Sequence, residues 1–210
     1  MQPLLKQNKA VLKKRKCLFY LGILLVSLLA GCQHVPQKIS PQHKPLTQWL
    51  LTGKLGIHVN QRAASAAVIW RQQLHNYDLT LQGPLGIGAL HITGTPQAAT
   101  LSTPNTTQSI QPIERFIEQQ FGWSIPVEHL LWWMQGLPAP ELLFTEARYD
   151  HHSRLTHFKQ QDWNITLKNY QTTSLDNAPT NTIDLPYQII LSKKSIRLTL
   201  LISHWQELDF

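Results

Sequence analysis

The chain has 210 residues, 42% of them hydrophobic and 15% charged, and its 19 lysines and arginines against 12 acidic residues give a formal net charge of +7. Six of those basic residues and no acidic residue lie within the first sixteen positions, so the rest of the chain carries 13 basic and 12 acidic residues. This balance argues against nucleic-acid binding, which requires basic side chains concentrated on the folded domain.

The N-terminal segment is typical of a secretory leader. The basic block is followed by fourteen uncharged residues, 17–30. A helix that crosses a bilayer needs about 20 apolar residues, so the alternative, an uncleaved anchor helix, is disfavoured by length. The segment ends in Leu-Ala-Gly-Cys at Cys32, a tetrapeptide that resembles the lipobox of bacterial lipoproteins.

The lipobox implies cleavage before Cys32 and lipidation of that residue. Residues 1–31 are then a lipoprotein signal peptide, and Gln33 at the next position resembles an outer-membrane sorting signal. Because Cys17 leaves with the leader and Cys32 is acylated, no disulfide is expected. Residues 32–47, which contain three prolines, are predicted to be a lipidated N-terminus and flexible tether, and 48–210 a single domain.

The first part of the domain shows the period-two alternation of half-buried strands. Strands are predicted over 51–59, 63–71, 77–82, 90–93 and 98–102. The alternation returns in the second half around Tyr149 and over 155–159, 163–170, 187–191 and 196–202. The polar stretch 171–182 is predicted to be a loop.

Two segments in the middle of the chain have helical spacing instead. The first is predicted over 113–121, after Pro112 and before Gly122, and the second over 126–135. The expected fold class is therefore mostly β with two or three short helices. Ten or eleven antiparallel strands would form one curled sheet, and the helices would cover its concave side.

The chain lacks the sequence patterns of the common catalytic sites. It has no Gly-x-Ser-x-Gly motif, phosphate loop or dinucleotide fingerprint after the leader. His151, His152 and His157 lie close in sequence, but without a cysteine partner they are interpreted as surface residues rather than metal ligands. The expectation is a non-enzymatic protein without metal or cofactor, and a lipid-anchored hydrolase is the least favoured alternative.

Several segments resemble the LolB family of outer-membrane lipoprotein receptors. In chain order they are WLLTGKLGIHV (49–59), VIW (68–70), YDLTLQGPLGIG (77–88), LLWWMQGLP (130–138), the stretch 161–170 around Trp163, and SHW (203–205). The resemblance covers nearly all of 45–206. It implies an incomplete antiparallel barrel with helices covering a hydrophobic cavity, without enzymatic activity or cofactor.

The resemblance also implies partners and a mechanism. A monomer on the periplasmic side of the outer membrane would accept the acyl chains of cargo lipoproteins from the periplasmic carrier LolA. It would then insert the cargo among outer-membrane phospholipids. Alternatives of similar fold are a lipid-anchored carrier of free lipids and an envelope-assembly scaffold.

Two sets of candidate site residues follow. Leu85, between Pro84 and Gly86, lies at the tip of a predicted turn, and the family places an exposed hydrophobic residue on this loop for membrane insertion. Periodicity cannot distinguish a cavity wall from plain core packing, so both remain open for the predicted acyl-chain cavity residues Trp70, Leu79, Leu81, Phe116, Ile117, Leu130, Trp133 and Met134.

Overall fold

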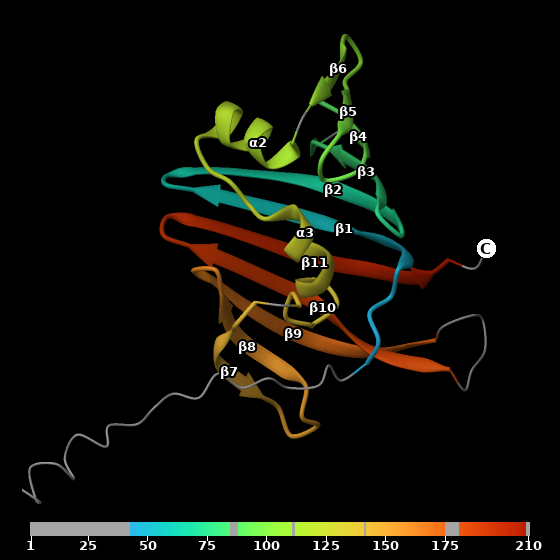
Figure 1. Cartoon of the computed structure of the whole chain (residues 1–210), viewed down its shortest axis with the longest axis vertical. Coiled ribbons are helices and arrows are strands. Elements are labelled where there is room, and N and C mark those ends of the chain that lie inside the picture. The colour runs from blue at the N-terminus through green and yellow to red at the C-terminus, as the bar shows by residue number, and fades with distance from the viewer. Residues whose placement is uncertain (1–42, 85–87, 111, 141, 175–180, 209–210) are drawn as a thin grey trace, which may run out of the picture. The chain divides into compact units, whose positions relative to one another are not determined.

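The computed structural model describes residues 43–84, 88–110, 112–140, 142–174 and 181–208. Within them lie two helices, α2 (Ile113–Phe121) and α3 (Val127–Trp133), and eleven strands (Figure 1). The strands are β1 Gln48–Val59, β2 Arg62–Gln73, β3 Asn76–Gln82, β4 Leu90–Gly94, β5 Ala99–Ser102, β6 Thr107–Ile110, β7 Thr145–Tyr149, β8 Leu155–Gln160, β9 Trp163–Ser174, β10 Thr182–Lys193 and β11 Ile196–Glu207.

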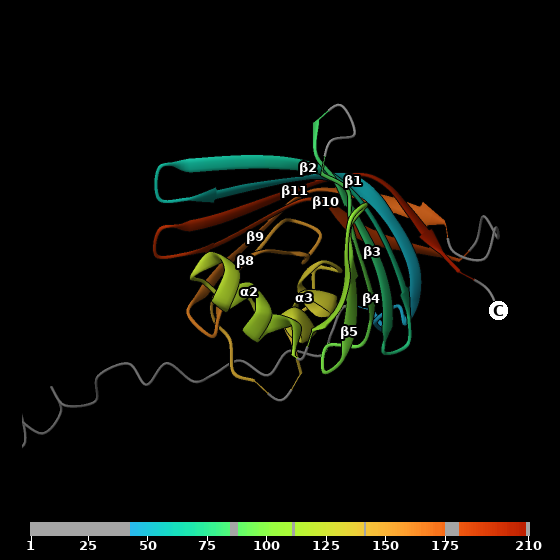
Figure 2. The same cartoon turned by 90° about the horizontal axis from the view of Figure 1, so that it is seen from above.

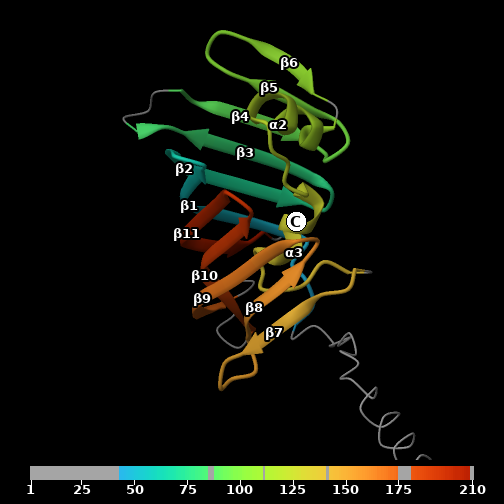
Figure 3. The ribbon, with the colours of Figure 1, turned by 90° about the vertical axis from the view of Figure 1, so that its left-hand side faces the viewer.

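All the described strands form one antiparallel sheet. Its order is β6-β5-β4-β3-β2-β1-β11-β10-β9-β8-β7, so the first and last strands of the chain pair with each other in the middle of the sheet (Figure 3). The register between β1 and β11 shifts once, between Thr52 and Gly53. Every other neighbouring pair of strands is consecutive in sequence, which is the arrangement of a meander.

The sheet curls around the two helices. Figure 2 shows the strands as an arc with α2 and α3 on its concave side. The edge strands β6 and β7 lie at opposite ends of the strand order, so the arc is an incomplete barrel. This confirms the predicted fold class: mostly β, one curled antiparallel sheet and short helices on its concave face.

The helix α2 begins and ends where its sequence predicts. Pro112 is the N-cap residue, with an extended backbone conformation, and Ile113 is the buried residue of the helix. Gly122 follows in the left-handed conformation at φ 74°, and its N–H donates to the carbonyl of Glu118. A residue with a β-carbon would be disfavoured there, which explains why the helix ends at this glycine.

The core is continuous across the concave face and contains a cluster of tryptophans. The ring of Trp49 lies 5.6 Å from that of Trp70 on β2 and 5.2 Å from that of Trp205 on β11, measured between ring centroids. Trp133 of α3 lies 6.4 Å from Trp163 of β9. The tryptophans thus connect the two halves of the sheet and attach α3 to one of them.

Residues 43–47, which the sequence places at the end of the tether, contact the domain; we call them the strap. Leu46 is 9% exposed, and its N–H donates to the side-chain oxygen of Gln135 at 2.6 Å. The Gln135 amide donates back to the Leu46 carbonyl at 3.1 Å and to the Leu131 carbonyl at 2.8 Å. A buried glutamine after α3 therefore holds the strap against the domain.

Two details of the sheet differ from the sequence-based prediction. The edge strand β6 was not predicted, and β9 continues to Ser174 although 171–182 was predicted to be a loop. Residues 171–174 pair with 182–185 of β10. The loop prediction was wrong there because backbone hydrogen bonds form a ladder regardless of side-chain polarity.

Candidate functional site

Exposure on the concave face increases along β1. Trp49 and Leu51 are 0% exposed, whereas Leu55 and Ile57, farther along the same face of the strand, are only partly buried. The same change occurs on β2, where Trp70 is buried and Ala64, nearer the turn to β1, is exposed. One end of the concave face is therefore closed, and the end at the β1–β2 turn is partly open.

Nine partly buried apolar side chains that pack against the core on the concave side of the sheet form what we call the concave apolar patch. They come from four strands and from α2, which lies over the sheet in Figure 2. The patch consists of Leu55, Ile57, Leu79, Leu81, Leu90, Phe116, Ile117, Ile196 and Leu200. These aliphatic and aromatic side chains present a surface suited to an apolar ligand rather than to a charged one.

The predicted cavity residues divide into two groups. Trp70, Trp133 and Met134 are buried in the core, with 7%, 0% and 3% exposure. Partly buried positions are occupied by Leu79, Leu81, Phe116, Ile117 and Leu130, of which all but Leu130 belong to the concave apolar patch. Whether any of them contacts an acyl chain stays a prediction.

The sequence reasoning did not select five residues of the patch. Leu55, Ile57, Leu90, Ile196 and Leu200 all stand in the period-two pattern of predicted strands. Their alternation identified the buried face but not how far along each strand the burial would extend. Small residues at 63–67, opposite Leu55 and Ile57 on β2, were the one local signal of space above the sheet.

The remaining predicted site residues lie mostly outside the described residues. Cys32, Leu85 and Gly86 are not described by the structure, whereas Pro84 is described and exposed. The lipidation site and the membrane-insertion loop therefore stay predictions. No helix within the described ranges is long and apolar enough to cross a membrane.

A second buried glutamine fixes α3 to the sheet. Gln160 of β8 is 1% exposed and accepts hydrogen bonds from the indole N–H of Trp133 at 2.7 Å and from the N–H of Ala139 at 2.9 Å. Its amide donates to the carbonyls of Ala139 and Leu142. Gln160 therefore attaches both α3 and the segment after it to β8, while Gln135 attaches the end of α3 to the strap.

The helix α2 has fewer such attachments. Its one fully buried residue is Ile113, while Phe121 at its C-terminal end is 62% exposed. Its polar link to α3 is the Glu114 carboxylate, which accepts a hydrogen bond from the N–H of Val127 at 2.8 Å. Of the two helices over the concave face, α2 is thus the less firmly held.

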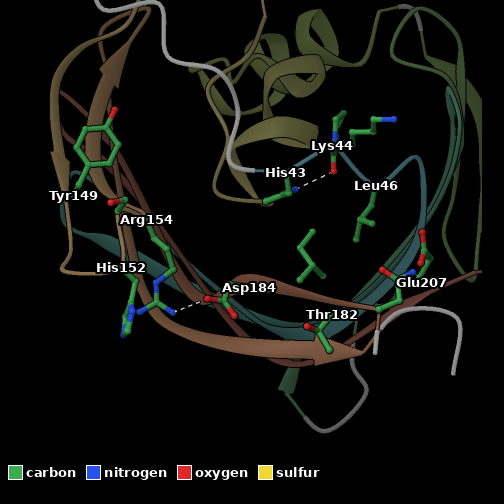
Figure 4. Close-up of a pocket in the computed structure, with 13 residues that line it drawn as sticks. His43, Lys44, Leu46, Tyr149, His152, Arg154, Thr182, Asp184 and Glu207 are labelled. Atoms are coloured by element: carbon green, nitrogen blue, oxygen red, sulfur yellow. Dashed lines mark hydrogen bonds and ion pairs between the residues drawn. The ribbon is translucent and has the colours of Figure 1, made fainter. Parts of the chain in front are cut away.

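A polar cleft lies at the other end of the sheet, beside the strap. Its volume is about 1050 Å³. Figure 4 shows Arg154, in the turn before β8, joined to Asp184 of β10 on one side of the cleft, with His43 and Lys44 of the strap on the other. The lining comprises His43, Lys44, Pro45, Leu46, Tyr149, His152, Ser153, Arg154, Asn181, Thr182, Ile183, Asp184 and Glu207, and none of the predicted cavity residues.

Arg154 is the central charge of this cleft and is already neutralised. Its guanidinium lies 2.7 Å from a carboxylate oxygen of Asp150 and 3.0 Å from one of Asp184, and it stacks 4.8 Å from the ring centroid of Tyr170. A hydrogen bond from the Thr172 hydroxyl lowers the pKa of Asp184, and Arg154 lowers it further against the effect of burial. Burial raises the pKa of the Tyr170 hydroxyl. This network stabilises the turn between β7 and β8 rather than offering a free charge to a ligand.

The cleft does not resemble a metal centre either. His151 and His152 lie side by side on the turn, with ring centroids 3.9 Å apart, while His157 bonds to Thr166 on β9. No group of three or more histidine, cysteine or acidic side chains is placed to hold a metal ion in the part of the chain that the structure describes.

Comparison with known proteins identifies the family. The model of the family described as "Outer membrane lipoprotein LolB" matches residues 47–205. The chain is 36% identical over 162 residues to the outer-membrane lipoprotein LolB of Stutzerimonas stutzeri (strain A1501). The aligned region covers 77% of this chain and 75% of that protein. It is 36% identical over 196 residues to the LolB of Pseudomonas fluorescens (strain Pf0-1), and this aligned region covers 86% of this chain and 92% of that protein.

Among solved structures, a LolA superfamily protein from Nitrosomonas europaea is similar over 80% of this chain and 89% of that one, with 8% identity and a TM-score of 0.48. The family match covers the whole described sheet except the last two residues of β11. The chain therefore belongs to the LolB family of outer-membrane lipoproteins.

Proposed function

We propose that this outer-membrane lipoprotein is a receptor that takes triacylated lipoproteins from a periplasmic carrier of the LolA type and inserts them into the inner leaflet of the outer membrane. The observation that carries the proposal is the concave apolar patch, a partly exposed apolar surface under a lightly held helix. The role is one of binding and transfer, in keeping with a family of lipoprotein localisation rather than of enzymes.

The energetics of the cargo require direct transfer. An acyl chain has about 15 methylenes, each worth roughly 0.8 kcal/mol when it is kept from water. Three chains amount to about 35 kcal/mol, so free diffusion of an acylated protein through the periplasm is negligible. A receptor must therefore offer an apolar surface that receives the chains from the carrier and gives them up to lipid.

The patch suits a ligand that has to leave again. Its side chains provide dispersion contacts without hydrogen-bonding groups, so they shield acyl chains without fixing them in one geometry. We infer that α2, which buries only Ile113 fully, yields to admit the chains while α3 stays on the sheet. The buried residues Gln135 and Gln160 would keep α3 in place.

Release would use the loop that contains Pro84, Leu85 and Gly86. In this proposal Leu85 enters the bilayer and brings the bound acyl chains next to lipid. The variant Leu85→Glu should accept cargo from the carrier as well as the parent protein but deliver it to liposomes at least tenfold more slowly. Gln82→Glu, an exposed position at the end of β3, is the matched control for added charge.

The receptor function is tested by transferring a labelled lipoprotein from purified carrier to the protein with Cys32 replaced, and then to liposomes. Ile57→Asp places a carboxylate in the concave apolar patch, whereas His58→Asp places it on the opposite, exposed face of the same strand. We expect Ile57→Asp to reduce cargo uptake at least tenfold and His58→Asp to leave it within twofold. Equal uptake by both variants would contradict a role for the patch.

The same assay separates the alternatives. Capture of free phospholipid but not of acylated protein would indicate a carrier of free lipids, and capture of neither would indicate an assembly scaffold. A cross-link between cargo and this protein that forms at a one-to-one ratio would support action as a monomer.

A further inference from the structure

The strap determines where the chain leaves the domain. Leu46 is bonded to Gln135 through both its N–H and its carbonyl, and the His43 ring lies within hydrogen-bond distance, 3.1 Å, of the Gln135 carbonyl. Only the ten residues 33–42 therefore separate the strap from Cys32. Ten residues span at most about 35 Å when fully extended, so the strap end of the domain remains near the membrane that holds the anchor.

An exposed leucine lies at this same end. Leu74 forms the turn between β2 and β3 with His75 and is 62% exposed. Its N–H donates to the carbonyl of Thr47 in the strap at 2.8 Å, and the Gln72 side chain donates to its carbonyl at 2.8 Å. In Figure 1 this turn and the beginning of β1 lie at the same side of the sheet, away from the β1–β2 turn.

The backbone conformation of Leu74 is unusual for an exposed leucine. Its φ is 53°, a left-handed conformation that is costly for a leucine and that turns of this length normally assign to glycine or asparagine. A residue that is both strained and exposed contributes little to the folded domain by itself. The two-residue turn imposes this φ, as the turns at Asn60 and Lys194 do at φ 54° and 53°, so the unusual feature is the exposed leucine at such a position.

The residues of the strap and of the turn 73–76 include no acidic side chain that would repel a lipid surface, and Lys44 carries a positive charge beside His43 and His75. The cleft beside the strap contains Asp184, which is paired with Arg154, and Glu207. Anionic headgroups attract basic groups that lie close to the membrane surface, and an apolar side chain between them can enter the boundary with the acyl chains.

We propose that the strap and the β2–β3 turn form the surface on which the domain rests on the outer membrane, with Leu74 inserted at the lipid boundary. The inference rests on the lipid anchor of the family and not on cargo transfer. The proposal implies two orientations of the domain on the membrane. The strand β3 runs from Asn76 beside the turn to Gln82, and Pro84 therefore lies beyond the end of the strand that is opposite to Leu74. Resting on Leu74 and delivering cargo through the Leu85 loop would then be successive states.

The experiment uses the acylated protein in liposomes of phosphatidylethanolamine and phosphatidylglycerol that contain a lipid-borne quencher. A fluorophore is attached at His75→Cys, beside Leu74, or at Gln61→Cys in the β1–β2 turn. We expect quenching at least threefold stronger at position 75 than at 61. Equal quenching at the two positions, or stronger quenching at 61, would overturn the proposal.

A pair of leucines tests the residue itself. Leu74→Ser in the His75→Cys background should lower quenching at least twofold, whereas Leu201→Ser, which changes a 48% exposed leucine on β11, should not. Leu74→Gly should lower quenching equally while keeping or raising the thermal midpoint, because glycine accepts the positive φ.

Unchanged quenching in both Leu74 variants contradicts the proposal. Cargo transfer in the same liposomes reports separately on the receptor function, so intact transfer with equal quenching overturns the resting surface alone.

Discussion

The carboxylate of Glu114 on α2 accepts a hydrogen bond from the backbone N–H of Val127, the first residue of α3, at 2.8 Å. It supplies the cap that Pro126 cannot, since that N-cap residue makes no side-chain hydrogen bond. Glu114→Ala should therefore destabilise the domain by about 1 kcal/mol, the usual value of a helix cap. Urea unfolding measures this, with Glu118→Ala on the exposed side of α2 as the control; equal effects would contradict the capping role.

Loss of the buried Gln160 side chain should cost more. Gln160→Leu leaves the indole N–H of Trp133 and the N–H of Ala139 buried without an acceptor, and each such donor costs about 1–3 kcal/mol. We expect the free energy of unfolding to fall by about 3 kcal/mol or more. Lys159→Leu, at the partly exposed neighbouring position, should change it by less than about 1 kcal/mol. Similar unfolding midpoints for Gln160→Leu and Lys159→Leu would show that the hydrogen bonds of Gln160 contribute little to stability.

Two glycines of β1 make a matched pair. A β-carbon on Gly53 would collide with the backbone carbonyl of Leu201 at the register shift, whereas one on Gly56 would meet the Thr199 carbonyl at an ordinary 3.7 Å. Gly53→Ala should destabilise by about 2 kcal/mol or more, because the obstacle is backbone and cannot rotate away. Gly56→Ala should be neutral or slightly stabilising. Thermal unfolding of the two variants compares them directly.

Acid should weaken the Arg154 network. The pKa of Asp184 lies below its ordinary value of 3.8, because Thr172 and Arg154 bond to its ionised form. The stabilisation is therefore complete above the unfolded-state pKa and is lost as the pH falls through the lower folded-state value. The parent protein should exceed Asp184→Asn in stability by at most about 1 kcal/mol near neutral pH, given the partial exposure of the pair. This difference in the free energy of unfolding should shrink in strong acid. When Thr172→Ala is present in both proteins, the difference should depend less steeply on pH.

Most strands and both helices follow from the local sequence pattern, because they have a regular burial period. Ile113–Phe121 was predictable from its spacing, its preceding proline and Gly122. The edge strand β6, Thr107–Ile110, was not, because three of its four residues are exposed and only Ile110 is buried. A polar edge strand has no alternation to detect, and its formation depends on backbone pairing with β5.

The site was harder to predict than the fold. Phe116 and Trp133 have equally helical patterns, yet one is partly exposed in the concave apolar patch and the other is 0% exposed in the core. Trp133 is fixed to β8 by the hydrogen bond of its indole N–H to Gln160, a residue 27 positions away, and Phe116 on α2 has no such contact to reveal in the local pattern. The docked strap escaped prediction for the same reason, since Leu46 and Gln135 are 89 positions apart.

The unpaired edges of the sheet bear on the size of the cargo. In the part of the chain that the structure describes, β6 and β7 end the strand order without pairing to each other, so no closed ring of hydrogen-bonded strands surrounds the concave face. On the proposed receptor function, a lipoprotein would present its acyl chains sideways while its folded part stays in solvent. The cargo would then need no threading or unfolding, so a small peptide and a large enzyme that bear the same lipid should be transferred alike.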